Sequence, residues 1–302
     1  MIGRLLSAGI PAVVVALVLA LSASAATGPV PVANWYWTMA VSNKSPNTLV
    51  LGTSSGLYRS TSGGKTWTPA GLSTVNVTSV VQDGNTLLAA GVTSNPKAGP
   101  VVATKGIYAP SPGKGVFAKS TNGGTAWLVV HPSGLPATGI QALAVDPTSA
   151  QTVYAVLTSG AIYRSTDGGS SFQFYSSKAG AHPWALAVGQ SGAFVAGDMT
   201  TGNYLSSNAK SWQTTMFVDP DGGHMVMEYA VQPGDLQHLL MTSYGVLSST
   251  NGGKTWTSSL KSKVMFGPVA FAPSSPSVAY AVGWDHSLWR TSNAGSTWTQ
   301  VA

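Results

Sequence analysis

The 302-residue chain contains no cysteine, which excludes a disulfide framework, a thiolate metal site, a cysteine nucleophile and lipid attachment through sulfur. Charged side chains are also scarce, at 8% of the residues, whereas a cytosolic helical protein normally carries many Lys and Glu on its exposed helix faces. The net charge of +6 is spread without a run of Lys or Arg. The clustered cations that neutralise several phosphates of a nucleic acid are therefore missing, and we expect no nucleic-acid partner.

The first 25 residues have the pattern of an export signal. Arg4 gives a weakly positive start, residues 10–21 are apolar, and Ala23-Ser24-Ala25 supplies a small-x-small cleavage site. The apolar run is shorter than the roughly 20 residues of a comfortable membrane span, although an uncleaved anchor is the alternative. The sequence therefore predicts a signal peptide at 1–25 and a secreted domain at 26–302 with no stable membrane span.

The remainder of the chain repeats one turn motif, Ser/Thr-x-Asn/Asp-x-Gly-x-Thr-Trp, six times. The aromatic residues that end the copies are 40 to 45 positions apart, except for one interval of 60. The first copy has Ser62 in place of the acid or amide, and the fourth copy has lost one residue. The copies occupy residues 60–67, 120–127, 165–172, 206–212, 249–256 and 291–298.

Each residue type in the motif suits a hairpin connection. The hydroxyl and the Asn or Asp side chain can bond the backbone of their own turn, and Gly can take the positive φ of a tight turn. Alternating or apolar stretches precede each turn, which gives four short strands per unit of about 40 residues. No helical periodicity follows the export signal. We therefore predict an all-β fold, a single β-propeller of six four-stranded blades with seven as the alternative, and all motif turns on one face.

The motif resembles the Asp-box, or bacterial neuraminidase repeat, of sialidases, xyloglucan-type glycoside hydrolases, sortilin ectodomains and photosystem II stability/assembly factors. The resemblance covers nearly the whole mature chain. The assembly factors are most similar in size, in the export signal and in the sequence motif Tyr-Arg-Ser-Thr-x-Gly-Gly. It implies a propeller fold but not one activity, because the motif occurs on propellers of unrelated function.

Residues outside the repeat are the candidates for a binding site. In a four-stranded blade they fall mostly on the face opposite the motif turns, which we call the variable face. Acids, histidines and tryptophans there can line a polar, aromatic-walled pocket, although 219–223 also reads as a simple turn. The predicted ligand-binding residues are Trp184, Asp198, Asp219, Asp221, His224, Glu228, Trp284, Asp285 and His286.

The sequence predicts no metal and no cofactor. Asp219, Asp221 and Glu228 are hard oxygen ligands, but their spacing does not form a calcium loop. His224 has no second histidine four residues on, which argues against zinc.

Glycoside hydrolysis needs two carboxyls about 5 to 9.5 Å apart, which acids around a ring can satisfy by chance. The sialidase resemblance implies three arginines from non-equivalent positions that grip a substrate carboxylate. The mature chain has only Arg59, Arg164 and Arg290, and all three stand immediately before a motif turn. This argues against a sialidase.

The same pre-motif position holds Arg59, Lys119, Arg164 and Arg290, which would form a contiguous basic arc in a closed ring. Such cations can bind the carbonyls of a neighbouring blade, or they can form a basic rim that receives an acidic segment or a polysaccharide. The sequence thus favours a secreted, monomeric, non-catalytic scaffold that binds protein or carbohydrate. The alternative function is a carbohydrate-active hydrolase.

We expect the exported protein to begin near Ala26, because a small-x-small site follows the apolar run. Amino-terminal sequencing of secreted material checks this, and a sequence that begins at Met1 would contradict it.

Overall fold

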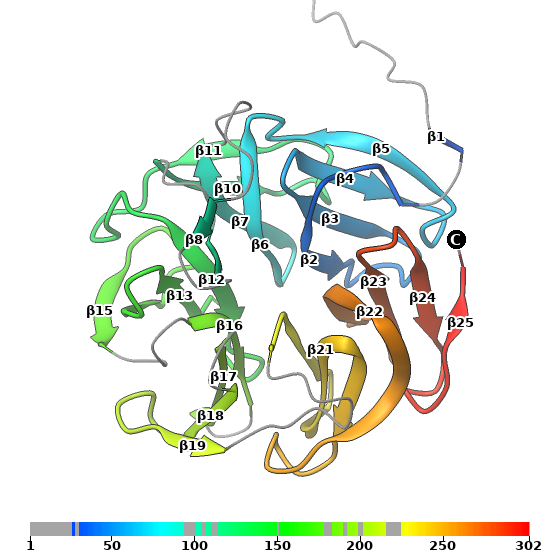
Figure 1. Cartoon of the computed structure of the whole chain (residues 1–302). Coiled ribbons are helices and arrows are strands. Elements are labelled where there is room, and N and C mark those ends of the chain that lie inside the picture. The colour runs from blue at the N-terminus through cyan, green and yellow to red at the C-terminus, as the bar shows by residue number, and fades with distance from the viewer. Residues whose placement is uncertain are drawn as a thin grey trace, which may run out of the picture.

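The computed structural model describes residues 26–27, 30–93, 101–103, 107–109, 114–149, 151–177, 183–189, 192–198, 202–215 and 225–301. In these residues the regular structure is all β, with antiparallel sheets arranged around a central axis as in a β-propeller (Figure 1). There is no α-helix in the described ranges. The prediction of an all-β propeller without helices is confirmed for this part of the chain.

Four sheets have the size of a propeller blade. The first has five strands in the order β1-β5-β4-β3-β2, and the other three have four strands each. Their strands are β1 Ala26–Thr27, β2 Tyr36–Val41, β3 Leu49–Thr53, β4 Gly56–Ser60 and β5 Thr66–Gly71; β6 Val75–Asp83, β7 Thr86–Thr93, β10 Gly115–Ser120 and β11 Leu128–Val130; β12 Ile140–Val145, β13 Val153–Leu157, β14 Ile162–Ser165 and β15 Gln173–Ser176; β16 Pro183–Val188, β17 Phe194–Asp198, β18 Gly202–Ser206 and β19 Gln213–Thr215.

The last two motif units share one six-stranded sheet, β20-β21-β22-β23-β24-β25. Strand β22 pairs with β21 near its start and with β23 near its end, so it joins two sets of strands. The bounds are β20 Tyr229–Gln232, β21 Asp235–Ser249, β22 Thr257–Ala272, β23 Ser275–Gly283, β24 Leu288–Thr291 and β25 Thr299–Gln300.

The prediction of six separate four-stranded blades, or seven, is therefore wrong: the described residues form four blades and one larger sheet, besides a small two-stranded hairpin. The physical reason lies between the fifth motif turn and Gly267. Residues 257–266 contain no Gly, Pro, Asn or Asp, so no turn former interrupts the extended chain there. In the link between the second and third units, by contrast, 132–139 contains two prolines and two glycines.

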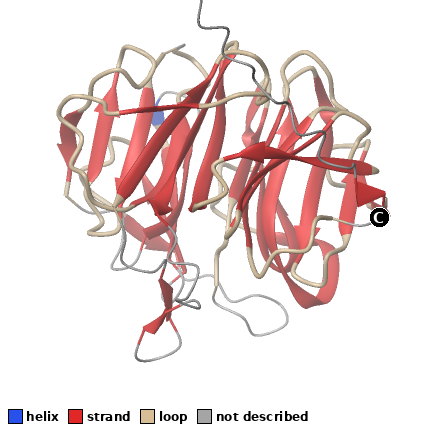
Figure 2. Ribbon diagram, turned by 90° about the horizontal axis from the view of Figure 1, so that it is seen from above, coloured by secondary structure: helices blue, strands red, loops and turns tan. Residues whose placement is uncertain are grey.

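The 60-residue interval contains an inserted hairpin. Strands β8 Val101–Ala103 and β9 Ile107–Ala109 pair with each other in a separate two-stranded sheet. Figure 2 shows this hairpin projecting from one face of the disc. The insertion therefore adds strands rather than helices. No helix of the described residues is long and apolar enough to cross a membrane.

The first sheet packs against the last one, and this contact closes the ring. One buried cluster combines Tyr36, Leu49 and Trp67 from the first sheet with Tyr280 and Leu288 from β23 and β24. These strands lie side by side in Figure 1.

The motif turns are held by their own side chains. In the first copy, Gly64 N–H donates to Ser60 Oγ over 2.9 Å, and Thr66 N–H donates to Ser62 Oγ over 2.9 Å. The hydroxyl of Ser62 thus accepts the bond that the Asn or Asp oxygen accepts in other copies, for example from Ala126 N–H to Asn122 Oδ1 at 3.0 Å. This explains how the departure at Ser62 is tolerated.

Four of the six turns bond a carbonyl in the connection between the first and second strands of their own unit, or in the first residues of the second strand. The donors are the backbone N–H groups of Gly63, Gly168, Gly252 and Ala294, and the acceptors are the carbonyls of Asn47, Gln151, Gln237 and Ser277. In these four units the motif turn therefore lies beside the place where the first strand connects to the second.

The second glycine of a motif turn lies against an apolar side chain of the preceding unit. A Cβ on Gly64, whose φ is +88°, would lie 2.0 Å from Leu288 Cδ2, and a Cβ on Gly124 would lie 2.8 Å from Val50 Cγ2. Gly64 therefore seats the first motif turn on the last sheet and belongs to the contact that closes the ring.

We expect Gly64→Ala to lower the free energy of unfolding by about 2–4 kcal/mol, because a methyl group would overlap fully buried Leu288 in a left-handed backbone conformation. Gly123→Ala is the matched control, since its φ is +69° but nothing lies within 4 Å of its Cβ position. The control should cost only about 1 kcal/mol. Urea unfolding measures both, and equal losses would contradict the ring-closing role of Gly64.

Candidate functional site

A central pocket of about 620 Å³ lies on the propeller axis. Its walls are the innermost strands β2, β6, β12, β16, β20 and the second half of β22. Because strands of all the principal sheets converge there, side chains far apart in the sequence meet around one space. Ligands favour such concave, largely apolar sites with a few converging polar groups.

The pocket is lined by buried residues at one end and by exposed residues at the other. At the base, the lining residues Trp37, Trp184 and Met227 are all less than 10% exposed. At the mouth, the lining residues Pro147 and Asp235 are exposed; Pro147 lies in the turn between β12 and β13, and Asp235 is the first residue of β21, directly after the turn that follows β20. The pocket therefore opens on the face of the motif turns, whereas the sequence placed the binding site on the variable face.

Tryptophan rings pack together at the base. Trp35 stacks on Trp37 with ring centroids 5.7 Å apart, and Trp37 contacts Trp184 at 5.3 Å. Trp284 meets the edge of Trp35 at 4.6 Å. Trp37 Nε1 also donates to Asn76 Oδ1 over 2.5 Å. These contacts fix large, rigid aromatic groups beneath the pocket.

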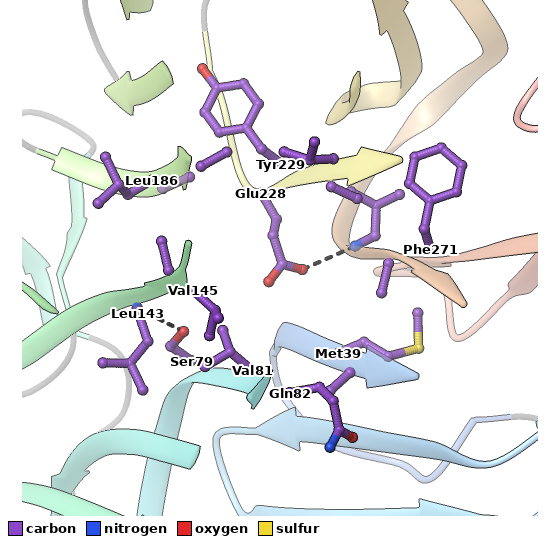
Figure 3. A pocket seen from close by; sticks show the side chains of 18 of the residues that line it. Met39, Ser79, Val81, Gln82, Leu143, Val145, Leu186, Glu228, Tyr229 and Phe271 are labelled. Atoms are coloured by element: carbon purple, nitrogen blue, oxygen red, sulfur yellow. Dashed lines mark hydrogen bonds between the residues drawn. The ribbon is translucent and has the colours of Figure 1, made fainter. Parts of the chain in front are cut away.

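Glu228 stands one residue before β20, next to this base. Figure 3 shows its carboxylate pointing into the pocket, whereas the ring of Tyr229 points away. Thr38 Oγ1 on β2 donates to Glu228 Oε1 over 2.8 Å, and Val269 N–H on β22 donates to Oε2 over 3.0 Å. The carboxyl thus connects three of the innermost strands.

Burial raises the pKa of Glu228 to about 8, although the hydrogen bonds from Thr38 and from the backbone of Val269 and Met39 lower it. The ordinary pKa is 4.5, so desolvation outweighs the three bonds. At neutral pH the group is mainly a protonated acid, which can both donate and accept a hydrogen bond.

The other described residues of the lining carry no positive charge. They include no Lys, Arg or His, and the second carboxylate among them is Asp235 at the mouth. Among the polar wall residues, Ser79 Oγ accepts a bond from Leu143 N–H at 2.9 Å and Thr78 donates to the carbonyl of Ile140 at 2.7 Å. These polar groups are engaged with neighbouring strands, so Glu228 is the principal group available for chemistry inside the pocket.

The structure brings together three of the nine predicted ligand-binding residues. Trp184 and Glu228 line the pocket, and Trp284 packs against the tryptophan and methionine side chains at its base. Asp285 instead caps its own turn, where Ser287 Oγ donates to it over 2.6 Å, and His286 contacts the Tyr36 hydroxyl.

Asp198 is the last residue of β17, and its backbone pairs with Gly202. Its side chain, and the whole of Asp219, Asp221 and His224, lie outside the described residues. Their part in binding stays a prediction. Within the described ranges no three His, Asp or Glu side chains gather as metal ligands do.

The cations of the basic arc are engaged in different ways. Arg59 Nε donates to the carbonyl of Gly123 over 2.8 Å, and Lys119 Nζ donates to that of Gly168 over 2.7 Å, so each holds the motif turn of the next sheet. Arg290 Nε donates to the Tyr280 hydroxyl over 3.3 Å, and Arg164 lies over the Tyr154 and Tyr175 rings. For Arg59 and Lys119 these are the contacts of repeat-stabilising residues.

Sequence reasoning missed Thr38, Val269 and Trp37 as parts of the site. Thr38 lies 190 residues from Glu228, and Val269 contributes only a backbone N–H. The available signal was positional: the lining residues come from the first strand of each repeat unit, and those strands converge on the axis of a propeller.

Glu228→Gln should become more stable relative to the wild-type protein as pH rises. The folded-state pKa of about 8 exceeds 4.5, so the folded protein holds this proton more tightly, and wild-type stability is lost as pH rises from about 4.5 through 8. Gln keeps an acceptor for Val269 N–H but does not ionise. We expect the difference in the free energy of unfolding between the two proteins to grow by about 4 kcal/mol between pH 5 and pH 9.

Thermal unfolding across this pH range measures the difference. Gln82→Ala, which removes a pocket-lining side chain that does not titrate, is the control and should give a constant difference. If the difference in stability between Glu228→Gln and the wild-type protein is also independent of pH, the raised pKa of Glu228 is contradicted.

No protein-family model matches the chain, and no curated protein is a significant sequence relative. Solved structures do match. "YCF48 bound to D1 peptide" is 20% identical with a TM-score of 0.52, covering 90% of this chain and 82% of that one. The GH74 enzyme of Niastella koreensis is 19% identical with a TM-score of 0.53, covering 87% of this chain but only 46% of the enzyme. YCF48 from Cyanidioschyzon merolae is 17% identical with a TM-score of 0.50, covering 90% and 86%. At these identities the likeness concerns the fold, and the chain folds as a β-propeller similar to those of YCF48 and of GH74 enzymes.

Proposed function

We propose that this protein is a secreted, monomeric, non-catalytic binding propeller whose central pocket receives a segment of a protein partner. The observation that carries the proposal is the pocket itself. It has about 620 Å³, a rigid aromatic base, mainly apolar walls and one carboxyl that points into it. Binding needs only such complementary surfaces, whereas catalysis needs several groups in different roles.

The similar fold of YCF48 supports a protein segment as the ligand, since one of those structures is described as bound to a D1 peptide. The hydrogen-bonded motif turns support the Asp-box resemblance, and residues 1–25 carry the export pattern. A carbohydrate is the other ligand class that an aromatic-based pocket suits, because sugar faces pack on tryptophan rings.

A second candidate is a carbohydrate-active hydrolase, favoured by one observation besides the likeness to GH74 enzymes. Glu228 has the raised pKa of a general acid. A glycosidase also needs a second carboxyl about 5 to 9.5 Å away. Among the lining residues that role falls to Asp235, but the four residues of β20, about 13 Å of extended chain, lie between the two acids. The chain also spans less than half of the GH74 enzyme of Niastella koreensis.

Selection from a displayed library of random peptides tests the proposal with the mature protein. We expect selected peptides to bind with Kd values of about 1–100 μM. Val81→Trp and Val145→Trp add bulk at partly exposed positions of the pocket wall and should weaken binding at least about ten-fold, or about 1.4 kcal/mol. Phe174→Ser, at a 61% exposed position on strand β15, is the control and should leave the affinity unchanged.

Fluorogenic glycosides and plant or bacterial polysaccharides, assayed with the same protein, test the second candidate. We expect no turnover. Peptide binding that is insensitive to both tryptophan substitutions would overturn the pocket as the binding site. Glycoside turnover that Glu228→Gln abolishes would replace the scaffold function with the hydrolase.

A further inference from the structure

The charge inside the central pocket is opposite to the charge of the chain. The protein carries a net charge of +6, yet the pocket lining, as far as the structure describes it, contains two carboxylates and no Lys, Arg or His. Two of the cations, Arg59 and Lys119, bind the carbonyls of motif turns. The pocket is therefore an acidic site in a basic protein.

Glu228 has spare capacity to bind a ligand. A carboxylate offers about four lone-pair sites, and the side-chain and backbone donors around it are the Thr38 hydroxyl and the N–H groups of Val269 and Met39. None of these donors carries a charge. A carboxylate that is removed from water without a counter-ion has an unfavourable desolvation free energy, and a bound cation would offset it.

The surroundings of Glu228 contain few other titratable groups. Across β2, β6, β12, β16 and β22 the pocket lining has none. On β20, Tyr229 donates its hydroxyl to Asn203, away from the pocket, and Asp235 lies at the mouth. Among the residues that the structure describes, none in the lining can therefore take the place of the missing positive charge.

The side chains of the pocket walls indicate the chemistry of the part of the ligand that does not contact Glu228. Met39, Val145 and Phe271 flank the carboxylate in Figure 3, and Trp37 and Trp184 lie at the base. An apolar chain packs well against such walls, and a cation also gains from nearby aromatic faces.

Resting on the proposed function, we infer that the pocket selects a cationic group, an ammonium or guanidinium carried on an apolar chain, and that Glu228 is its counter-ion. The lysine and arginine side chains of a protein partner have this chemistry. Binding is then coupled to one proton transfer: the protonated Glu228 carboxyl releases its proton to solvent, and the resulting carboxylate pairs with the incoming cation.

Three small probes of equal chain length test the inference: n-hexylammonium, n-hexanol and n-hexanoate. Tryptophan fluorescence reports binding, because Trp37 and Trp184 line the pocket. We expect n-hexylammonium to bind at least ten-fold more tightly than n-hexanol, and n-hexanoate not to bind. Calorimetry at pH 7 in two buffers of different ionisation enthalpy should show about 0.9 proton released per ammonium bound, given a pKa of about 8 for Glu228.

Glu228→Gln should abolish both the preference for ammonium over alcohol and the proton release, while hexanol still binds. Asp146→Asn is the matched control: it makes the same change from acid to amide beside the mouth, but Asp146 is not among the described lining residues, and its bond from Thr148 N–H can be kept by Asn. The control should keep the affinity within two-fold and the proton release unchanged.

Equal binding of the ammonium and the alcohol, absence of proton release, or absence of binding by all three probes would each overturn the inference. The peptide selection decides the proposed function separately. Selected peptides that bind in the pocket but contain no Lys or Arg would support the proposed function. They would contradict the inference that the ligand carries a cationic group.

Discussion

The structure depends on how each motif turn sits on the sheet before it. The second glycine of the turn brings backbone against an apolar side chain of the preceding unit, as Gly124 does at Val50. Where Gly64 meets Leu288, the same contact joins the first unit to the last and closes the ring. Since interiors are close-packed, small changes at these contacts are transmitted to the adjoining sheets. A closed ring then fixes the innermost strands around the axis, and the pocket exists because they cannot collapse together.

The periodic features of the fold are predictable from the sequence because each follows from a few adjacent residues. The turn hydroxyl, the Asn or Asp and the glycines are local, so the strands and the bonds within turns such as 120–127 follow. The position of Arg59 before a motif also indicates a structural contact, since it recurs with the repeat. The predicted number of blades was wrong because strand pairing also depends on the segments that connect successive repeat units. An extended link at 257–266, without turn formers, lets β22 serve two sets of strands.

The site was less predictable because its parts are not periodic. Glu228 was recognised as a candidate only because the chain has few acids, and the side of the disc expected for it was not the side on which the pocket opens. Its partners Thr38 and Val269 are brought to it by ring closure, across 190 and 41 positions of sequence. No local pattern encodes a meeting of that kind. Asp285, by contrast, is adjacent to its partner Ser287, and its turn-capping bond is of the sort that adjacent residues predict.

Glu228 is also where the molecule departs from the rules that the rest of it obeys. A glutamine could keep the same geometry with Thr38 and Val269, since its oxygen accepts and its amide donates, without the desolvation that raises the pKa of the acid. Charged side chains elsewhere make structural hydrogen bonds: Arg59 and Lys119 bind the carbonyls of motif turns, and the Asp167 carboxylate accepts bonds from Ser171 and Ser165. A carboxyl placed on the axis, with no cation among the described residues of the pocket lining, costs stability at neutral pH and gains nothing structural over the amide. Departures of this kind concentrate at functional sites, because the cost is recovered when a ligand supplies the missing group. The physical asymmetry between Glu and Gln at this one position therefore argues that the pocket is a binding site and that its occupant is positively charged.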